Sequence, residues 1–185
     1  MKHFLFGLLL ALTATGALAQ SADATQKRLE TEAVKLKSWA QDPLFVAAVI
    51  AQNKQHITPA EIDKRDKAWV AGTDEPLVKQ MTTGPCADHL RKLAAASPIY
   101  SESFVMDDQG ALVCANQRTS DYMQGDEAKW IRSFNNGKGA VFIDRPRFDE
   151  SAKEHLAQIS LPIMSGGHAI GAITIGADVE KLATH

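Results

Sequence analysis

Two pairs of strand-like runs, each joined by a short turn, constrain the fold of this chain more than any other feature. Ser103–Met106 and Ala111–Ala115 flank the turn DDQG, and the longer runs His155–Met164 and Ala169–Ala177 flank the turn SGGH. Glycine and Asp tolerate the positive φ that tight hairpin turns require. The sequence therefore predicts two antiparallel hairpins.

A helical segment and one further strand lie between these hairpins. The segment SDYMQGDEAKWIRSFNNGKG is predicted to be a helical insert, and Ala140–Asp144 follows it as a middle strand. The predicted fold class is α+β: a PAS-like five-stranded antiparallel sheet, with a helical insert packed on it after the second strand. Everything before Ile99 is predicted to be helix that covers the sheet.

The helical half opens with a long N-terminal helix. Thr25–Gln41 carries Leu29, Ala33, Leu36 and Ala40 at helical spacing, with Lys and Glu between them. This spacing places the apolar side chains on one stripe of an amphipathic helix. We expect that stripe to be buried.

Shorter helices follow it. Asp42-Pro43 suits a helix restart, with Asp as the N-cap and Pro in the first turn. The run to Asn53 is therefore either a second helix or part of one long kinked helix. The capping box TPAE opens another helix at Pro59. Two more helices are expected over Glu75–Met81 and Pro85–Ala96.

Residues 1–19 have the pattern of a secretory signal peptide. The apolar run Phe4–Leu12 is shorter than the ~20 residues that a membrane span needs, and Ala17-Leu18-Ala19 forms a small-x-small cleavage site before Gln20. An uncleaved N-terminal anchor is the alternative. We expect a leader (1–19), a helical region (20–97) and a sheet domain (98–185). After cleavage the protein is expected to be periplasmic or secreted and not to span the membrane.

The chain has two cysteines, Cys86 and Cys114. In an oxidising compartment each has one possible partner, so we expect a disulfide between them. Two separate buried thiols are the alternative. The formal net charge of −2 gives no general attraction to nucleic acid.

Aromatic and charged side chains are concentrated in the insert. Trp130, Ile131 and Phe134 are expected to share a helix face that covers the sheet. Nearby acidic groups would bind an amine, whereas Arg118 and Arg132 would bind a carboxylate.

A pocket needs apolar walls with a few fixed polar groups, and the strands and the insert together offer both. The predicted ligand-binding residues are Ser101, Ser103, Arg118, Asp121, Tyr122, Asp126, Trp130, Asp144 and Ser160. The alternative for several of them is structural. Tyr122 and Trp130 would then be core residues, Asp126 a helix cap, and Asp144 an ion-pair partner of Arg145 or Arg147.

Residues 98–179 resemble a Cache domain, the extracytoplasmic PAS-like sensor module also called PDC. The resemblance is carried by the ordered set of the D-x-x-G turn, SDYMQGDEAKW, VFIDRPRFDES and QISLPIMSGGHAIGAITIG. It implies small-ligand binding under the segment between the second and third strands. It also implies a sensor input module. We expect its signal to pass to a membrane partner, such as a histidine kinase, cyclase or chemoreceptor, and simple delivery of the ligand is the alternative.

No catalytic motif accompanies these features. The chain has no G-x-S-x-G elbow and no P-loop, and neither a metal site nor a cofactor is expected. The predicted function is that of a periplasmic sensor domain for a small molecule of the amino acid, amine or organic acid class. The alternative is a ligand-free periplasmic interaction module.

Overall fold

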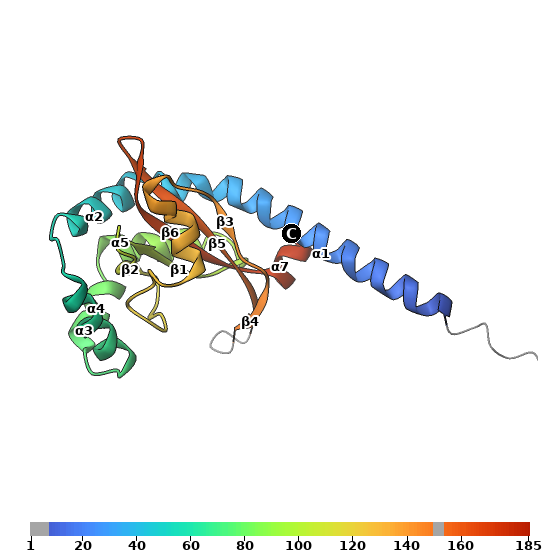
Figure 1. Cartoon of the computed structure of the whole chain (residues 1–185), viewed down its shortest axis with the longest axis horizontal. Coiled ribbons are helices and arrows are strands. Elements are labelled where there is room, and N and C mark those ends of the chain that lie inside the picture. Colours follow the sequence, from blue (N-terminus) through green and yellow to red (C-terminus); the bar gives the residue numbers. More distant parts are fainter. Residues whose placement is uncertain (1–7, 150–153) are drawn as a thin grey trace, which may run out of the picture.

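The computed structural model describes residues 8–149 and 154–185, and it has an α+β fold built on one antiparallel sheet (Figure 1). The strand order is β2-β1-β6-β5-β3, and β4 pairs with β5 beside β3. The strands are β1 (Tyr100–Met106), β2 (Leu112–Ala115), β3 (Phe142–Ile143), β4 (Arg147–Asp149), β5 (Glu154–Ser165) and β6 (His168–Asp178). All five predicted strands are present. The middle strand is shorter than predicted, and β4 is an additional strand.

The hairpin of β5 and β6 has two chemically different faces. Ile159 and Leu161 of β5 and Ile175 of β6 point to one face and are fully or almost fully buried. Ser160 and Thr174 point to the other face and pair with each other across the two strands. Because side chains alternate along a strand, each strand contributes to both faces.

Helices pack on both sides of this sheet. They are α1 (Leu8–Ala40), α2 (Pro43–Asn53), α3 (Pro59–Val70), α4 (Glu75–Thr82), α5 (Pro85–Ala94), α6 (Ala128–Phe134) and α7 (Val179–Thr184). Helices α1, α2 and α5 share a hydrophobic core with the apolar face of the β5–β6 hairpin. Helices α3 and α4 form a second core with the opposite face of β1, at Phe104 and Met106.

The predicted helix starts in this region are confirmed. Asp42 caps α2 by accepting a hydrogen bond from the backbone N–H of Leu44 at 2.8 Å, and Pro43 is the first helical residue. Thr58 caps α3 through the N–H of Glu61. The chain therefore bends between α1 and α2, because the Asp-Pro pair ends one helix and begins the next.

Helix α1 begins earlier than predicted. It runs from Leu8 to Ala40 without a break at the expected cleavage site, and its first turns project away from the sheet in Figure 1. Of the predicted leader, residues 1–7 lie outside the described residues and Leu8–Ala19 is the first part of α1. Cleavage after Ala19 stays a prediction.

The predicted disulfide is present and joins α5 to the sheet. Cys86 is in the first turn of α5 and Cys114 is in β2, with 6.0 Å between their Cα atoms. Cys114 is buried in the core that α1, α2 and α5 form with the sheet. The bond therefore holds the last of the N-terminal helices against an edge strand.

Thiol chemistry tests this bond. Denatured, unreduced protein should show no reactive thiol, and reduced protein should show two. Because the cross-link restricts the unfolded chain over a separation of 28 residues, its reduction should lower the free energy of unfolding by roughly 3 kcal/mol. Two labelled thiols per chain before reduction would contradict the structure.

The turn between β1 and β2 depends on one buried carboxylate. Asp107 is 1% exposed and accepts hydrogen bonds from the backbone N–H groups of Gln109 and Ala111, both at 2.9 Å. Gln52 of α2 donates to the same carboxylate at 2.8 Å and to the carbonyl of Leu112 at 2.9 Å. Burial raises the pKa of Asp107, and the bond from Gln52 opposes that increase.

Removal of this amide should destabilise the protein in a pH-dependent way. Gln52→Met leaves Asp107 with one donor fewer, so the free energy of unfolding at pH 7 should fall by roughly 1–3 kcal/mol. The pKa of folded Asp107 then lies further above its ordinary 3.8. A raised pKa gives stability that is present below the unfolded value and is lost as the pH rises through the folded value.

The loss of the bond to Leu112 is the same at every pH, so the difference between variant and parent should be smaller near pH 4 and largest at neutral pH. Urea denaturation at both pH values measures it. The matched control is Gln55→Met, because Gln55 is exposed just after the same helix. A loss of equal size at both pH values would contradict the role of Asp107.

Candidate functional site

A polar cleft lies on the sheet face that helix α6 covers. It consists of two adjoining cavities of about 560 Å³ and 230 Å³, which share Glu102, Glu127 and Gln158. The larger cavity is lined by Glu102, Phe104, Gln117, Arg118, Thr119, Ser120, Asp121, Gln124, Glu127, Lys129 and Gln158. The smaller is lined by Glu102, Glu127, Asp144, Arg145, Arg147, Phe148, Leu156 and Gln158.

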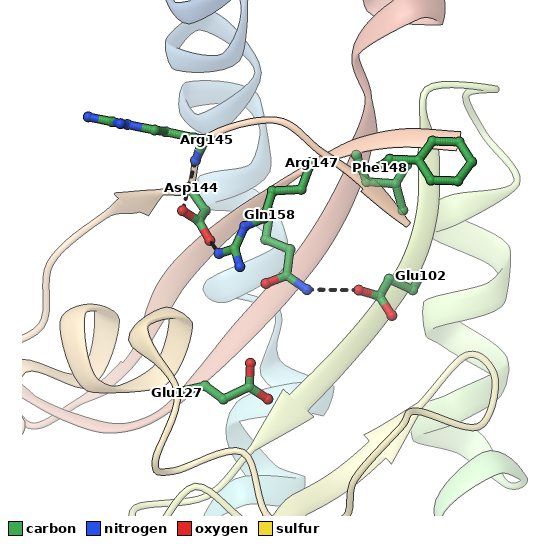
Figure 2. A pocket seen from close by; sticks show the side chains of 8 residues that line it. Glu102, Glu127, Asp144, Arg145, Arg147, Phe148 and Gln158 are labelled. Atoms are coloured by element: carbon green, nitrogen blue, oxygen red, sulfur yellow. Dashed lines mark hydrogen bonds and ion pairs between the residues drawn. The ribbon is translucent and has the colours of Figure 1, made fainter. Parts of the chain in front are cut away.

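The floor of the cleft joins two strands across a third. Gln158 of β5 donates a hydrogen bond from Nε2 to Oε1 of Glu102 on β1 at 3.0 Å (Figure 2). Strand β6 lies between them, and Gly176 is the residue of β6 that pairs with Gln158. A Cβ at Gly176 would lie 3.0 Å from Cγ of Glu102. The glycine therefore leaves the space in which the carboxylate and the amide meet.

The centre of the cleft contains an ion pair. Lys129 Nζ lies 2.9 Å from Glu127 Oε1, and it also lies over the ring of Phe104, 5.3 Å from the centroid. Lys129 is only 6% exposed. A cation that is this deeply buried requires a compensating anion, and Glu127 supplies it.

The insert forms one wall of the larger cavity. Gln124 is 1% exposed and donates from Nε2 to the carbonyl of Asp121 at 2.7 Å, whereas its Oε1 has no hydrogen-bond partner. Arg118 donates to the carbonyl of Trp69 and lies over the Trp69 ring, 5.8 Å from its centroid. The guanidinium is thus engaged with the protein on one side.

Charged residues form the rim of the smaller cavity, as Figure 2 shows. Asp144 follows β3, accepts a hydrogen bond from the backbone N–H of Arg145 at 2.8 Å and pairs with the guanidinium of Arg147. The cleft therefore offers both signs of charge within one cavity system. Such a site suits a small polar ligand with both acceptor and donor groups.

Three predicted ligand-binding residues line this cleft: Arg118, Asp121 and Asp144. Ser160 lies on the same sheet face but is fully buried, and its hydroxyl is 2.8 Å from that of Thr174. The structural alternative for Asp144 also holds, because it pairs with Arg147.

The remaining predicted residues are not brought to the cleft. Ser103 pairs with Ile175 of β6 and so points to the opposite, helix-covered face. Ser101 is half-buried and lines neither cavity. Neither hydroxyl faces the cleft, because the alternation of β1 puts Glu102 and Phe104 there instead.

Tyr122 and Trp130 are structural residues. Tyr122 is fully buried beside Trp69, with 6.1 Å between ring centroids, and burial raises its pKa. Trp130 donates from Nε1 to the carbonyl of Asp107 at 3.0 Å and stacks on Phe134 at 4.7 Å. Both residues are therefore placed as the structural alternative predicted, as packing residues and not as part of the cleft lining.

The expected face of α6 is also wrong. Lys129 and Ser133 are buried, whereas Ile131 is 50% exposed. The helix begins at Ala128, after Glu127 as its N-cap. Lys129 lies over the ring of Phe104 on β1 and so faces the sheet. Asp126 is exposed and borders a separate cavity beside α3.

Among the lining residues that were not predicted, four are central to the site: Glu102, Glu127, Lys129 and Gln158. Two had a signal in the sequence. Glu102 alternates with Phe104 and Met106 in β1, and a carboxylate on an apolar strand face is unusual. Gln158 alternates in the same way with Leu156 of β5. Lys129 had none, because its burial depends on how α6 is rotated against the sheet.

Within residues 8–149 and 154–185, no three His, Cys, Asp or Glu side chains are grouped so that they could bind a metal ion. No helix of the described chain combines the length and apolar character that crossing a membrane requires.

No protein-family model and no curated protein matches the chain. Solved structures do. The ligand-binding domain of the Pseudomonas fluorescens chemoreceptor CtaA, in complex with L-serine, is 13% identical over 94% of this chain and 63% of that one, with a TM-score of 0.47. The sensory domain of the Campylobacter jejuni chemoreceptor Tlp3 is 10% identical over 86% and 66%, with a TM-score of 0.45.

The extracellular domain of rpHK1S-Z16, assigned as a histidine kinase, is 19% identical over 91% of this chain and 61% of that one, with a TM-score of 0.45. The chain thus spans less than two thirds of each of these three domains. These three structures are the sensory or ligand-binding domains of two chemoreceptors and the extracellular domain of a histidine kinase.

A pair of substitutions on α6 tests the placement of Trp130. Trp130→Ala removes a packed ring and its hydrogen bond, so it should lower the free energy of unfolding by roughly 2–3 kcal/mol. The control Ile131→Ala removes an exposed side chain from the next position and should change it by less than ~0.5 kcal/mol. Chemical denaturation of both variants gives the comparison. Equal losses would show that α6 is rotated so that Ile131 packs as closely as Trp130.

Proposed function

We propose that this chain is an extracytoplasmic Cache-type sensor domain that binds a small ligand in the cleft between α6 and the sheet. The observation that carries the proposal is the cleft itself, where Glu102, Lys129 and Gln158 converge on one cavity from β1, α6 and β5. A sheet face that served only for packing would be filled by apolar side chains. Open space lined by fixed polar groups supports ligand binding.

The proposed ligand is an amino acid, an amine or an organic acid. Carboxylates at Glu102 and Asp144 suit an ammonium group, whereas Lys129 and Arg118 suit a carboxylate. The proposed location is the periplasm or the cell exterior, after removal of the leader. The disulfide supports this location, because such bonds persist in oxidising compartments.

We propose further that binding is passed to a membrane protein, such as a histidine kinase, cyclase or chemoreceptor. Helix α1 supports this route, because it packs on β5 and β6 behind the cleft and extends beyond the sheet (Figure 1). A ligand that altered the β5–β6 hairpin would act directly on that helix.

A thermal-shift screen of the exported protein against amino acids, amines and organic acids tests the function. A ligand at a hundred times its dissociation constant should raise the free energy of unfolding by ~2.7 kcal/mol. Gln158→Leu, which removes the hydrogen bond to Glu102, should reduce that gain. The control Gln26→Leu alters an exposed amide on α1 and should keep it. A panel with no stabilising compound, or a gain that Gln158→Leu leaves intact, would count against ligand binding in this cleft.

A further inference from the structure

The two partners of the central ion pair are unequally buried. The Lys129 side chain is 7% exposed and that of Glu127 is 44% exposed, although their charged atoms lie 2.9 Å apart. Phe104 holds the ammonium from the other side, with its ring centroid 5.3 Å from Nζ. The cation is therefore fixed inside the cleft, whereas the carboxylate is at its mouth.

This asymmetry determines which partner can leave. Glu127 is the N-cap of α6, but its side chain makes no capping hydrogen bond. If the side chain turned toward water, the pair with Lys129 would break, but no capping hydrogen bond of the helix would be lost. A carboxylate in water is well solvated. An unpaired buried ammonium is costly. An anion beside Lys129 is therefore strongly favoured, and one anion can replace another there.

The other two carboxylates of the same cavity are engaged elsewhere, and Asp121 accepts a hydrogen bond from the hydroxyl of Ser120 at 2.7 Å. Glu102 lines the same cavity, but Gln158 Nε2 holds its carboxylate at 3.0 Å on the sheet floor. An anion that enters from solvent would therefore compete chiefly with Glu127. The exchange would leave the bond between Glu102 and Gln158 in place.

A second observation in the same cavity points to a ligand. Gln124 is 1% exposed, its Nε2 is fixed by the carbonyl of Asp121, and its Oε1 has no partner. Buried acceptors are almost always hydrogen-bonded in folded proteins. The cavity thus combines a buried ammonium with an unsatisfied acceptor, which suits an anion that also carries an N–H or O–H donor.

We propose that Glu127 is a tethered competitor, which pairs with Lys129 until the carboxylate of a small ligand replaces it. The inference rests on the proposed function and narrows its ligand class to carboxylates, so that simple amines are excluded. Only molecules with the pair open can bind. The apparent dissociation constant is therefore the intrinsic one divided by the open fraction.

Acetate is the probe, because it carries the anion alone and fits a cavity of about 560 Å³. It is titrated into the protein at constant ionic strength, and binding is followed by NMR through the side-chain amide of Gln124. If the pair is closed in about nine-tenths of molecules, Glu127→Gln should lower the dissociation constant for acetate about tenfold. Lys129→Met should abolish the response.

The matched control is Glu61→Gln. Glu61 is also about half exposed, at 40%, and pairs with Arg65 at 3.0 Å on α3, outside the cleft. The Glu61→Gln variant should bind acetate with the same dissociation constant as the parent. Methylammonium, titrated in parallel, should give no response that depends on Glu127.

The outcomes separate this inference from the sensor function. Equal affinity for acetate in the parent and Glu127→Gln, or no binding in either, would overturn the exchange. The sensor function would still stand if a ligand from the screen were lost in Gln158→Leu. Should Glu127→Gln fail to fold in chloride, recovery of folding when acetate replaces chloride supports the exchange. Failure in both salts would show that the pair is structural and would overturn it.

Discussion

The pairing of β5 with β6 is the interaction on which the rest of the structure depends. These strands of 12 and 11 residues are the longest in the sheet, and β1, β3 and β4 all attach to their outer edges. One face of the hairpin holds α1 and α2 through Ile159, Leu161 and Ile175. The other face holds α6 and the cleft. A register shift of one residue would exchange the two faces, so the register determines both the core and the site.

The cleft exists because several positions on this sheet face lack the apolar side chains that would otherwise fill the space. Gly176 has no side chain between Glu102 and Gln158 on the cleft floor, and a Cβ there would crowd Glu102. Ser160 and Thr174 satisfy each other beneath α6. Lys129 reaches into the interface between α6 and the sheet with its charge compensated by Glu127. Buried ionic groups can often be replaced by apolar residues without loss of stability, which supports a functional reason for this arrangement.

Much of the fold could be predicted because its signals are local. Asp-Pro at residue 42, the capping box at Thr58 and the turn SGGH specify their own elements, and the structure has them where expected. The N-terminal extent of α1 and the pairing of β4 were missed. Strand β4 has three residues and is defined by its partner β5 rather than by its own pattern.

The site was harder to predict, because its geometry depends on small rotations. Alternation in β1 was evident from the sequence, but which face carried the cleft was not, and the hydroxyls of Ser101 and Ser103 were preferred over Glu102. Successive side chains of α6 point about 100° apart. A rotation of the helix by that amount would therefore put the ring of Trp130 in the cleft in place of the charge of Lys129. The contact between Trp130 and Asp107 settles that rotation, since it holds the ring against the β1–β2 turn. The same bond turns Lys129 toward Phe104, so the position of the charged site follows from the packing of its neighbour.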